Sequence, residues 1–404
     1  MMTSFKVVPY KNIAEERKFR LERFHFYPAT MTTSLSDFVI KRYSNEGDNI
    51  LDPFCGTASI LRVGNILSRN GVGVDSNPLA SMIAKVSLTS YDAEQLVDKL
   101  ALLLDNISAI EFDQEFVNMN NLSYWFEKEP LDAIASLNHE VNLLKKRSIR
   151  EFYKLTLSSI VRSISKADPN ISPPVYSKYM RLKYKLTPRD EVIRRFEYAA
   201  TRNIAKSQIN KERIRPDSIV RIHNTNTDNF LHRDKKVYEL IFTSPPYAAA
   251  QKYVRSTSLE LMTIFNKSRK DLVELDKVDL GSEAVRKIDR KYTEITDKLI
   301  RVSLNKKYKM IYGRYLYKLT LLFSRIYNKL EDNGRFVFVI GENATSKGEV
   351  VSLLNPIIDI AGDTGLEIHE KFIDPIRSRN FSIKRNNMVP AMNNEYLLVF
   401  KKSG

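Results

Sequence analysis

The segment from Thr243 to Tyr247, with the sequence Thr-Ser-Pro-Pro-Tyr, brings together a hydroxyl group, a rigid backbone and an aromatic ring. Its two prolines lack a backbone N–H and have a fixed φ angle, so we expect them to end the preceding apolar strand, residues 238–242, in an extended corner. Backbone carbonyls and the Ser244 hydroxyl can accept hydrogen bonds from an amine on a planar ring, while Tyr247 stacks on its face. A proline-rich loop without a catalytic role is an equally good interpretation of this segment alone.

A second segment, residues 49–59, has the sequence Asn-Ile-Leu-Asp-Pro-Phe-Cys-Gly-Thr-Ala-Ser. It begins as a short apolar strand, breaks at an Asp-Pro pair and passes through small residues into an apolar pattern of helical spacing, residues 60–67. We expect this helix to end at Asn70-Gly71 and a further strand, residues 72–74, to end at Asp75. An acid about 20 residues after the glycine is typical of Rossmann-like sheets that bind ribose hydroxyls, and an ordinary strand–helix–strand turn is the alternative.

Together, the two segments resemble those of the amino-group DNA methyltransferases, which use S-adenosylmethionine. The Asp-Pro-Phe-Cys-Gly run is similar to the family's cofactor loop, and Thr-Ser-Pro-Pro-Tyr is similar to its catalytic loop, in the form found mostly in cytosine-N4 enzymes. The resemblance covers roughly residues 20–90 and 218–401. Weaker matches to family segments lie at residues 25–30, 75–78, 226–228, 333–340 and 395–400.

The resemblance implies a role for individual residues. The catalytic residues that it implies are Ser244, Pro245, Pro246 and Tyr247. The residues that it implies for binding S-adenosylmethionine are Tyr27, Pro28, Ala29, Thr30, Asp52, Pro53, Phe54, Cys55, Gly56, Thr57, Ala58, Asp75, Ser76, Asn77, Asp228 and Thr243. Ala58 stands where the family usually has a second glycine, and because alanine is strained at positive φ, we expect a near-helical backbone there.

Cys55 is the only cysteine of the chain, and it lies in the cofactor loop, far in sequence from the Pro-Pro corner. Methylation of cytosine at C5 requires a thiolate that attacks the ring, so the position of this thiol argues against that reaction. The target is then an exocyclic amine, whose N–H groups donate to the Ser244 hydroxyl and the Pro245 carbonyl. The base must leave the duplex for this chemistry, and Tyr247 would stack on it.

Four functions are consistent with these motifs. Methylation of cytosine N4 in duplex DNA is favoured over adenine N6, on resemblance alone, because serine precedes the Pro-Pro pair. A tRNA guanine-N2 methyltransferase has similar loops but usually carries a large RNA-binding domain ahead of the cofactor loop, where this chain has about 50 residues. A non-catalytic DNA-binding protein with a decayed core is the fourth. The first function also implies a restriction-modification system, in which a cognate restriction endonuclease acts separately on the same site.

The composition is compatible with a nucleic-acid partner. The 404 residues include 64 Lys and Arg against 48 Asp and Glu, a net charge of +16, which favours a polyanion such as double-stranded DNA. One cysteine and five histidines without ligand-like spacing predict no disulfide framework and no metal site. No apolar stretch is long enough to cross a membrane and no apolar signal core begins the chain, so we expect a cytoplasmic protein, bacterial or archaeal by the resemblance.

The motifs divide the chain into a core and two insertions. We expect residues 1–90 and 218–404 to form an α/β methyltransferase core with a mixed, mostly parallel seven-stranded sheet, as the resemblance implies. Residues 91–217 have a helical pattern and would recognise the DNA target, and residues 266–309 form a smaller charged insertion. The candidate DNA-binding residues are Lys178, Arg181, Lys183, Lys185, Lys252, Tyr253, Arg255, Arg377 and Arg379. A solvated helical face is the alternative for the basic part of the first insertion.

Overall fold

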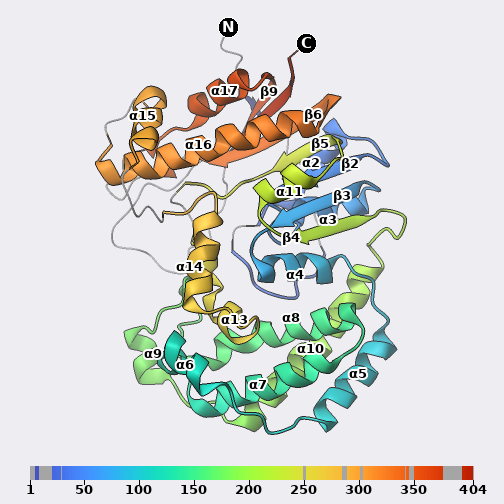
Figure 1. The fold of residues 1–404 in the computed structure, drawn as a ribbon. Helices are drawn as coiled ribbons and strands as arrows, with labels where there is room; N and C mark the ends of the chain where they lie inside the picture. Colours follow the sequence, from blue (N-terminus) through green and yellow to red (C-terminus); the bar gives the residue numbers. More distant parts are fainter. Residues whose placement is uncertain are drawn as a thin grey trace.

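The computed structural model describes residues 5–8, 21–28, 30–248, 252–283, 289–300, 304–341, 343–344, 350–375 and 394–403. Figure 1 shows two parts, a twisted sheet with helices on both faces and a helical region below it. Three of the residues assigned above, Ala29, Arg377 and Arg379, lie outside the described residues.

The sheet has eight strands in the described residues, in the order β1-β9-β10-β6-β5-β2-β3-β4. Strand β10 is antiparallel to both of its neighbours, and the other pairs are parallel. The strands are β1 (Lys6–Val7), β2 (Asn49–Asp52), β3 (Asn70–Asp75), β4 (Val220–Asn224), β5 (Tyr238–Thr243), β6 (Leu330–Gly341), β9 (Leu366–Pro375) and β10 (Asn394–Lys402). The predicted Rossmann-like, mostly parallel α/β fold is confirmed, and the short edge strand β1 adds one strand to the expected seven. A separate pair is formed by β7 (Asn343–Ala344) and β8 (Val350–Val351).

Helices cover both faces of this sheet because its central strands are apolar on both sides. In β6, Phe336 and Phe338 belong to the core beneath α16 (Lys306–Lys329) and α17 (Leu354–Asp363), and α11 (Thr227–Arg233) contacts α16. Val337 and Val339 belong to the opposite core, beneath α2 (Thr33–Tyr43) and α3 (Ser59–Ile66). Because β2, β3 and β5 are parallel, their carboxyl ends lie at the same edge of the sheet, between the two layers of helices.

Residues 91–217 contain helices and, before the loop that leads to β4, no strand. The helices are α5 (Ala93–Asp105), α6 (Gln114–Asn120), η2 (Leu122–Tyr124), α7 (Lys128–Leu143), α8 (Arg147–Val161), η3 (Arg162–Ile164), α9 (Lys178–Lys183) and α10 (Arg189–Lys211). Their apolar side chains share one core with α4 (Pro78–Ser87), which contacts both α8 and the sheet. The helical region is thus fixed to the core through the helix that follows Asp75.

Residues 243–247 form the corner to which the sequence assigned a catalytic role, and they are called the catalytic corner below. The segment after this corner is also helical. It contains α12 (Tyr253–Ser256), α13 (Ser258–Thr263), α14 (Arg269–Val278) and α15 (Arg290–Leu299). Helix α13 contacts α4, α7, α8 and α14, so it lies where the sheet and the helical region meet. In Figure 1, α14 spans the distance between the sheet and the helical region.

The prediction for the end of the helix after the cofactor loop is wrong. Helix α3 ends at Ile66, and Ser68, with φ 64°, adopts the left-handed conformation expected of a glycine. Asn70 and Gly71 instead begin β3. Space is tight at Gly71, because a Cβ would lie 3.1 Å from a Leu61 methyl and 3.3 Å from a Val220 methyl.

Candidate active site

Asp52 ends β2 and joins it to the catalytic strand β5. Its Oδ1 accepts a hydrogen bond of 2.8 Å from the Thr243 hydroxyl and one of 3.1 Å from the Phe54 N–H. The side chain is only 2% exposed, and this burial raises its pKa to about 7, while the two hydrogen bonds act in the opposite direction. The cofactor loop and the catalytic corner, 191 residues apart in sequence, are therefore in direct contact.

Asp75 ends β3 and orders the loop that follows β2. One carboxylate oxygen accepts from the Gly56 N–H at 2.9 Å and the other from the Asn77 N–H at 2.7 Å. Burial raises the pKa of Asp75 to about 6 against the effect of these hydrogen bonds. Asn77 also lies 3.4 Å from the Tyr27 hydroxyl, which brings the upstream segment to the same place. Two acceptor oxygens at the end of this strand suit a pair of ribose hydroxyls.

Ala58 does not have the near-helical backbone that we expected. Its φ and ψ are 60° and 37°, which is the left-handed region, and its side chain is fully buried. Its N–H donates to the Cys55 carbonyl at 2.6 Å, and its own carbonyl accepts from the Arg62 N–H at 2.9 Å. The loop turns this tightly to enter α3, so alanine takes a conformation that glycine would adopt without strain.

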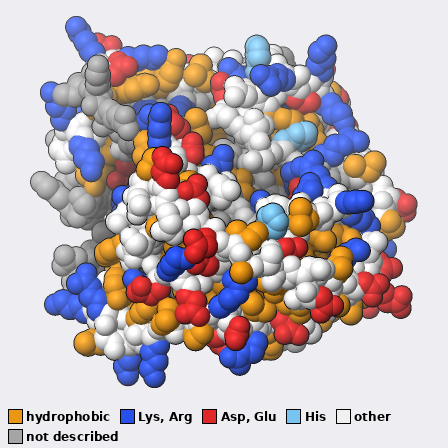
Figure 2. Space-filling view, turned by 60° about the horizontal axis from the view of Figure 1, so that its bottom comes forward, with side chains coloured by type: hydrophobic (Ala, Val, Ile, Leu, Met, Phe, Trp, Pro, Cys, Tyr) orange, Lys and Arg blue, Asp and Glu red, His pale blue; other side chains and the backbone are white. Residues whose placement is uncertain are grey.

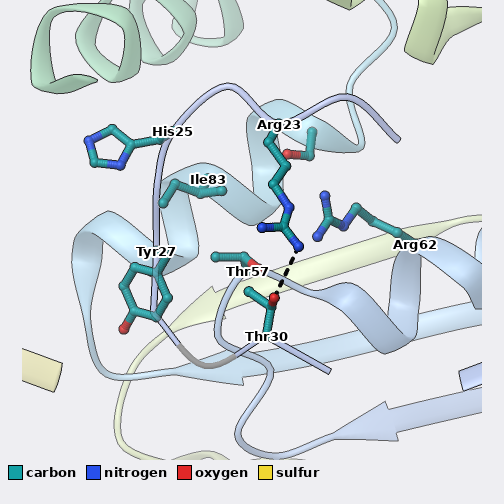
Figure 3. Close-up of a pocket in the computed structure, with 8 residues that line it drawn as sticks. Arg23, His25, Tyr27, Thr30, Thr57, Arg62 and Ile83 are labelled. Atoms are coloured by element: carbon teal, nitrogen blue, oxygen red, sulfur yellow. Dashed lines mark hydrogen bonds between the residues drawn. The ribbon is translucent and has the colours of Figure 1, made fainter. Parts of the chain in front are cut away.

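A small pocket lies beside this loop, and it contains two arginines and no acid among its lining residues (Figure 3). The lining residues are Arg23, His25, Tyr27, Thr30, Thr57, Arg62, Ile83 and Ser87. Burial, and then the neighbouring Arg23 guanidinium, lower the pKa of Arg62 to about 10. Arg62 donates to the Ser59 hydroxyl at 3.3 Å, and the hydroxyls of Thr57 and Ser87 are buried without a partner among the described residues. Uncompensated positive charge beside free hydroxyls suits a carboxylate ligand.

The catalytic corner holds its hydroxyl groups in a chain. The Ser244 Oγ lies 3.2 Å from the Tyr247 hydroxyl oxygen, and the Tyr247 hydroxyl donates to Oε1 of Glu395 on β10 at 3.1 Å. Burial, and then the Glu395 carboxylate, raise the pKa of Tyr247 well above its ordinary value. Tyr247 therefore stays protonated at neutral pH. Pro245 is buried and Pro246 partly buried, so the corner is fixed on both sides.

Gly281, in the segment after α14, lies in close contact with this corner. A Cβ at Gly281 would lie 2.7 Å from the Tyr247 carbonyl oxygen and 3.1 Å from the Pro246 Cβ. Two cations of α16 hold the segment in place, since Arg314 donates to the Lys277 carbonyl at 2.6 Å and Lys318 to the Asp279 carbonyl at 3.0 Å. Burial lowers the pKa of Lys318 to about 8. Part of the smaller charged insertion is thus a wall of the catalytic corner.

Tyr253 and Asp228 have surroundings that the sequence did not indicate. The Tyr253 ring stacks on Tyr27 with 6.4 Å between centroids, so it lies deeper than the exposed Lys252 and Arg255 beside it. The Asp228 carboxylate pairs with Arg325 at 2.7 Å. Its neighbour Thr227 donates to the Pro53 carbonyl at 2.5 Å, which attaches the start of α11 to the cofactor loop.

The remaining assigned residues fall into two groups. Pro28, Thr30, Phe54 and Ser76 lie in segments that meet near the ends of β2 and β3. The basic residues Lys178, Arg181, Lys183 and Lys185 are exposed on or just after α9, which lies at the left edge of the helical region in Figure 1, beside α6. Figure 2 looks toward the helical region and shows Lys and Arg gathered at the upper right of this face, above a mixed surface of both charges.

Sequence reasoning missed three residues of this site. Glu395 is an acid near the start of an otherwise apolar strand, and Arg62 interrupts an apolar helical run. A charge within an apolar pattern is the signal that could have indicated them. Gly281 was visible only as a break in a charged helical stretch. Its close approach to the corner depends on long-range packing that the sequence does not show.

The described residues lack two further features. They contain no group of three or more His, Cys, Asp or Glu side chains that is arranged to bind a metal ion. Among the same residues, no helix is both long enough and apolar enough to cross a membrane.

Known proteins with similar sequences are methyltransferases. A family model described as DNA methylase, of the N6/N4 type, matches residues 4–86. The chain is 24% identical to the type II methyltransferase M.MjaII of Methanocaldococcus jannaschii, over 71% of this chain and 70% of that protein. It is 21% identical to M.BsoBI of Geobacillus stearothermophilus, over 93% of this chain and 83% of that one.

A third relative is M.MvaI of Kocuria varians, 21% identical over 66% of this chain and 63%, less than two thirds, of that protein. Among solved structures, the rRNA methyltransferase AviRa of Streptomyces viridochromogenes aligns with 96% of this chain and 94% of its own, at 10% identity and a TM-score of 0.32, which is too low to support a conclusion. The family model and the three relatives are all methyltransferases, and the strand order is that of a mostly parallel, Rossmann-like sheet. The chain is thus similar to DNA methylases of the N6/N4 type over residues 4–86, and to three type II methyltransferases at 21–24% identity.

Proposed function

We propose that this protein transfers a methyl group from S-adenosylmethionine to the N4 amine of a flipped cytosine, at one short sequence of duplex DNA. The main support for the proposal is the hydrogen bond between Asp52 and Thr243. It joins the end of β2, the strand that precedes the cofactor loop, to the residue before Ser244. A donor bound against β2 and an amine held at the corner are then adjacent. Adenine N6 is the alternative target, and serine before the Pro-Pro pair favours cytosine by resemblance alone.

The residues at the ends of β2 and β3 fit the chemical groups of S-adenosylmethionine. Asp75 offers two carboxylate oxygens for the ribose hydroxyls, and the Tyr27 and Tyr253 rings form an aromatic wall beside them. Arg62 offers a buried positive charge for the carboxylate of the methionine half. When bound, the cofactor supplies an electrophilic methyl carbon attached to a positively charged sulfur.

The corner supplies acceptors for an amine. An exocyclic amine is a poor nucleophile because its lone pair is delocalised into the ring. Acceptors around its N–H groups favour the tetrahedral form, in which the lone pair is available. Ser244 offers a hydroxyl oxygen and Pro245 a carbonyl oxygen for this purpose. Tyr247 would stack on the extruded base, as expected for chemistry on a base edge.

In this proposal, residues of the two insertions bind the DNA. Lys252 and Arg255 follow the corner directly and are exposed, so they would contact phosphates next to the flipped nucleotide. The basic residues of α9 would contact the duplex further away, with affinity that falls as salt rises. A separate restriction endonuclease and a cytoplasmic location complete the restriction-modification system that we propose.

The test is the identity of the methylated base. The purified protein is incubated with methyl-labelled S-adenosylmethionine and DNA from a host without methyltransferases, and the DNA is digested to nucleosides for mass spectrometry. We expect label in N4-methylcytosine. Label in N6-methyladenine alone would select the alternative target, and transfer to tRNA but not to DNA would contradict the DNA assignment.

A further inference from the structure

Glu395 lies at the start of β10, opposite Gly341 of β6, on the strand next but one to the catalytic strand β5. Its Oε1 accepts a hydrogen bond from the Tyr247 hydroxyl at 3.1 Å. The carboxylate also contributes to raising the pKa values of both Tyr247 and Tyr253, after burial and, for Tyr253, after Asp279 and Asp75. Glu395 is therefore an acid that faces the catalytic corner, although it is 148 residues from Tyr247 in sequence.

The carboxylate sets the direction of the two hydrogen bonds that link Ser244, Tyr247 and Glu395. An ionised carboxylate can only accept, so the single hydroxyl hydrogen of Tyr247 points toward Glu395. The contact of 3.2 Å between Ser244 and Tyr247 then requires that Ser244 be the donor. The lone pairs of Ser244 Oγ remain available to accept a hydrogen bond from a third group. The chain of hydrogen bonds therefore runs one way, from that group through the two hydroxyls to Glu395.

We propose that Ser244, Tyr247 and Glu395 form a proton relay that removes the proton released by the target amine. The inference rests on the proposed function. Once the amine nitrogen carries the new methyl group, it has a positive charge and one proton too many. That proton moves to Ser244 Oγ, the serine proton moves to the Tyr247 oxygen, and the tyrosine proton moves to Glu395. The N–H bond is broken, an O–H bond forms on Glu395, and both hydroxyls are neutral before and after the transfer.

The relay removes a difficulty at the corner. A neutral serine is too weak a base to keep a proton, and the raised pKa of Tyr247 excludes a tyrosinate that could take it. Both hydroxyls can nevertheless pass a proton on, since each accepts one hydrogen bond and donates another. Glu395 is then the group that holds the proton and releases it to solvent.

Single-turnover methyl transfer to duplex DNA by four variants tests the relay. Glu395→Gln keeps a side-chain oxygen that can accept from Tyr247 but cannot take a proton. We expect it to lower the rate about 100-fold, as Glu395→Ala does, because proton transfer contributes a factor of this order. Tyr247→Phe interrupts the chain and should be as slow, and Glu395→Asp, which keeps a carboxylate, should recover part of the rate. The affinity for S-adenosylhomocysteine, measured by calorimetry, should stay within about twofold, a change of about 0.4 kcal/mol.

The isosteric variant separates a relay from mere positioning of Tyr247. A rate of Glu395→Gln equal to that of the unaltered protein, with Glu395→Ala slow, would overturn the relay, because an accepting oxygen alone would then be sufficient. Loss of cofactor affinity in proportion to the rate would overturn it as well. An unaltered protein that binds S-adenosylhomocysteine and methylates no DNA would contradict the proposed function itself, and the relay with it.

Discussion

Gly281 lies against Tyr247 so closely that a Cβ at residue 281 would be 2.7 Å from the Tyr247 carbonyl oxygen. The same Cβ would be 3.1 Å from the Pro246 side chain. The corner formed by residues 243–247 is therefore limited on one side by a residue of the charged segment after α14. The position of this segment depends in turn on Arg314 and Lys318 of α16.

Gly281→Ala should slow methyl transfer without preventing cofactor binding. The added methyl group must displace the backbone of the corner, and a misplacement of about 1 Å near the reacting atoms can lower a rate about 100-fold. Single-turnover kinetics and calorimetry with S-adenosylhomocysteine measure the two effects separately. Gly362→Ala is the matched control, since a Cβ there meets nothing within 4 Å. Equal rates for the two variants would show that the corner does not depend on this contact.

Arg62→Met should weaken the binding of ligands that carry the methionine carboxylate. A buried hydrogen-bonded charge pair contributes enough that its loss lowers affinity about 10- to 100-fold. S-adenosylhomocysteine has this carboxylate and 5′-methylthioadenosine lacks it, so only the first ligand should lose affinity in the variant. Calorimetry with both ligands is the measurement. An equal loss for the two would assign Arg62 a structural role in the loop.

Asp52→Asn should make the protein relatively more stable as the pH rises. Burial raises the pKa of Asp52 to about 7 in the folded protein, so the folded state holds this proton more tightly than the unfolded chain. Its contribution to stability is present below the unfolded pKa of about 4 and is lost as the pH rises to about 7. The asparagine variant does not titrate.

Urea unfolding at pH 4 and pH 8 measures this effect. The difference in the free energy of unfolding, variant minus unaltered protein, should increase by roughly 2–4 kcal/mol between the two pH values. Asp363→Asn, at an exposed carboxyl, is the matched control. A difference for Asp52→Asn that does not change with pH would mean that this carboxyl is ionised in the folded protein throughout the range.

The sequence predicted the elements that follow from local patterns. Strands β2, β3, β5, β6 and β10 occur where apolar runs end in turn residues, and helix α3 follows the spacing of its apolar residues. Backbone conformations that depend on tertiary contacts were predicted less well. Ser68 and Ala58 take the left-handed region because the chain must reverse before β3 and before α3, and neither residue type favours that conformation.

The candidate site was predictable as far as its motifs extend. Asp52, Asp75, Thr243 and Ser244 meet at one edge of the sheet because parallel strands end there. Glu395 lies in a weakly matching strand segment, and no motif assigns a role to Glu395, Gly281 or Arg62. The contacts of Glu395 and Gly281 with the corner form only when distant parts of the chain pack together. The roles of Tyr253 and Asp228 could not be separated in sequence from those of their exposed neighbours.

We propose that the Ser-Pro-Pro-Tyr corner methylates an exocyclic amine of DNA. The most direct measurement is the nucleoside content of DNA from a methylation-free host that expresses either this protein or its Ser244→Ala variant. We predict N4-methylcytosine at one short sequence with the unaltered protein and its absence with the variant, while the variant still binds S-adenosylhomocysteine. The appearance of 5-methylcytosine, or equal methylation by the two proteins, would contradict the claim.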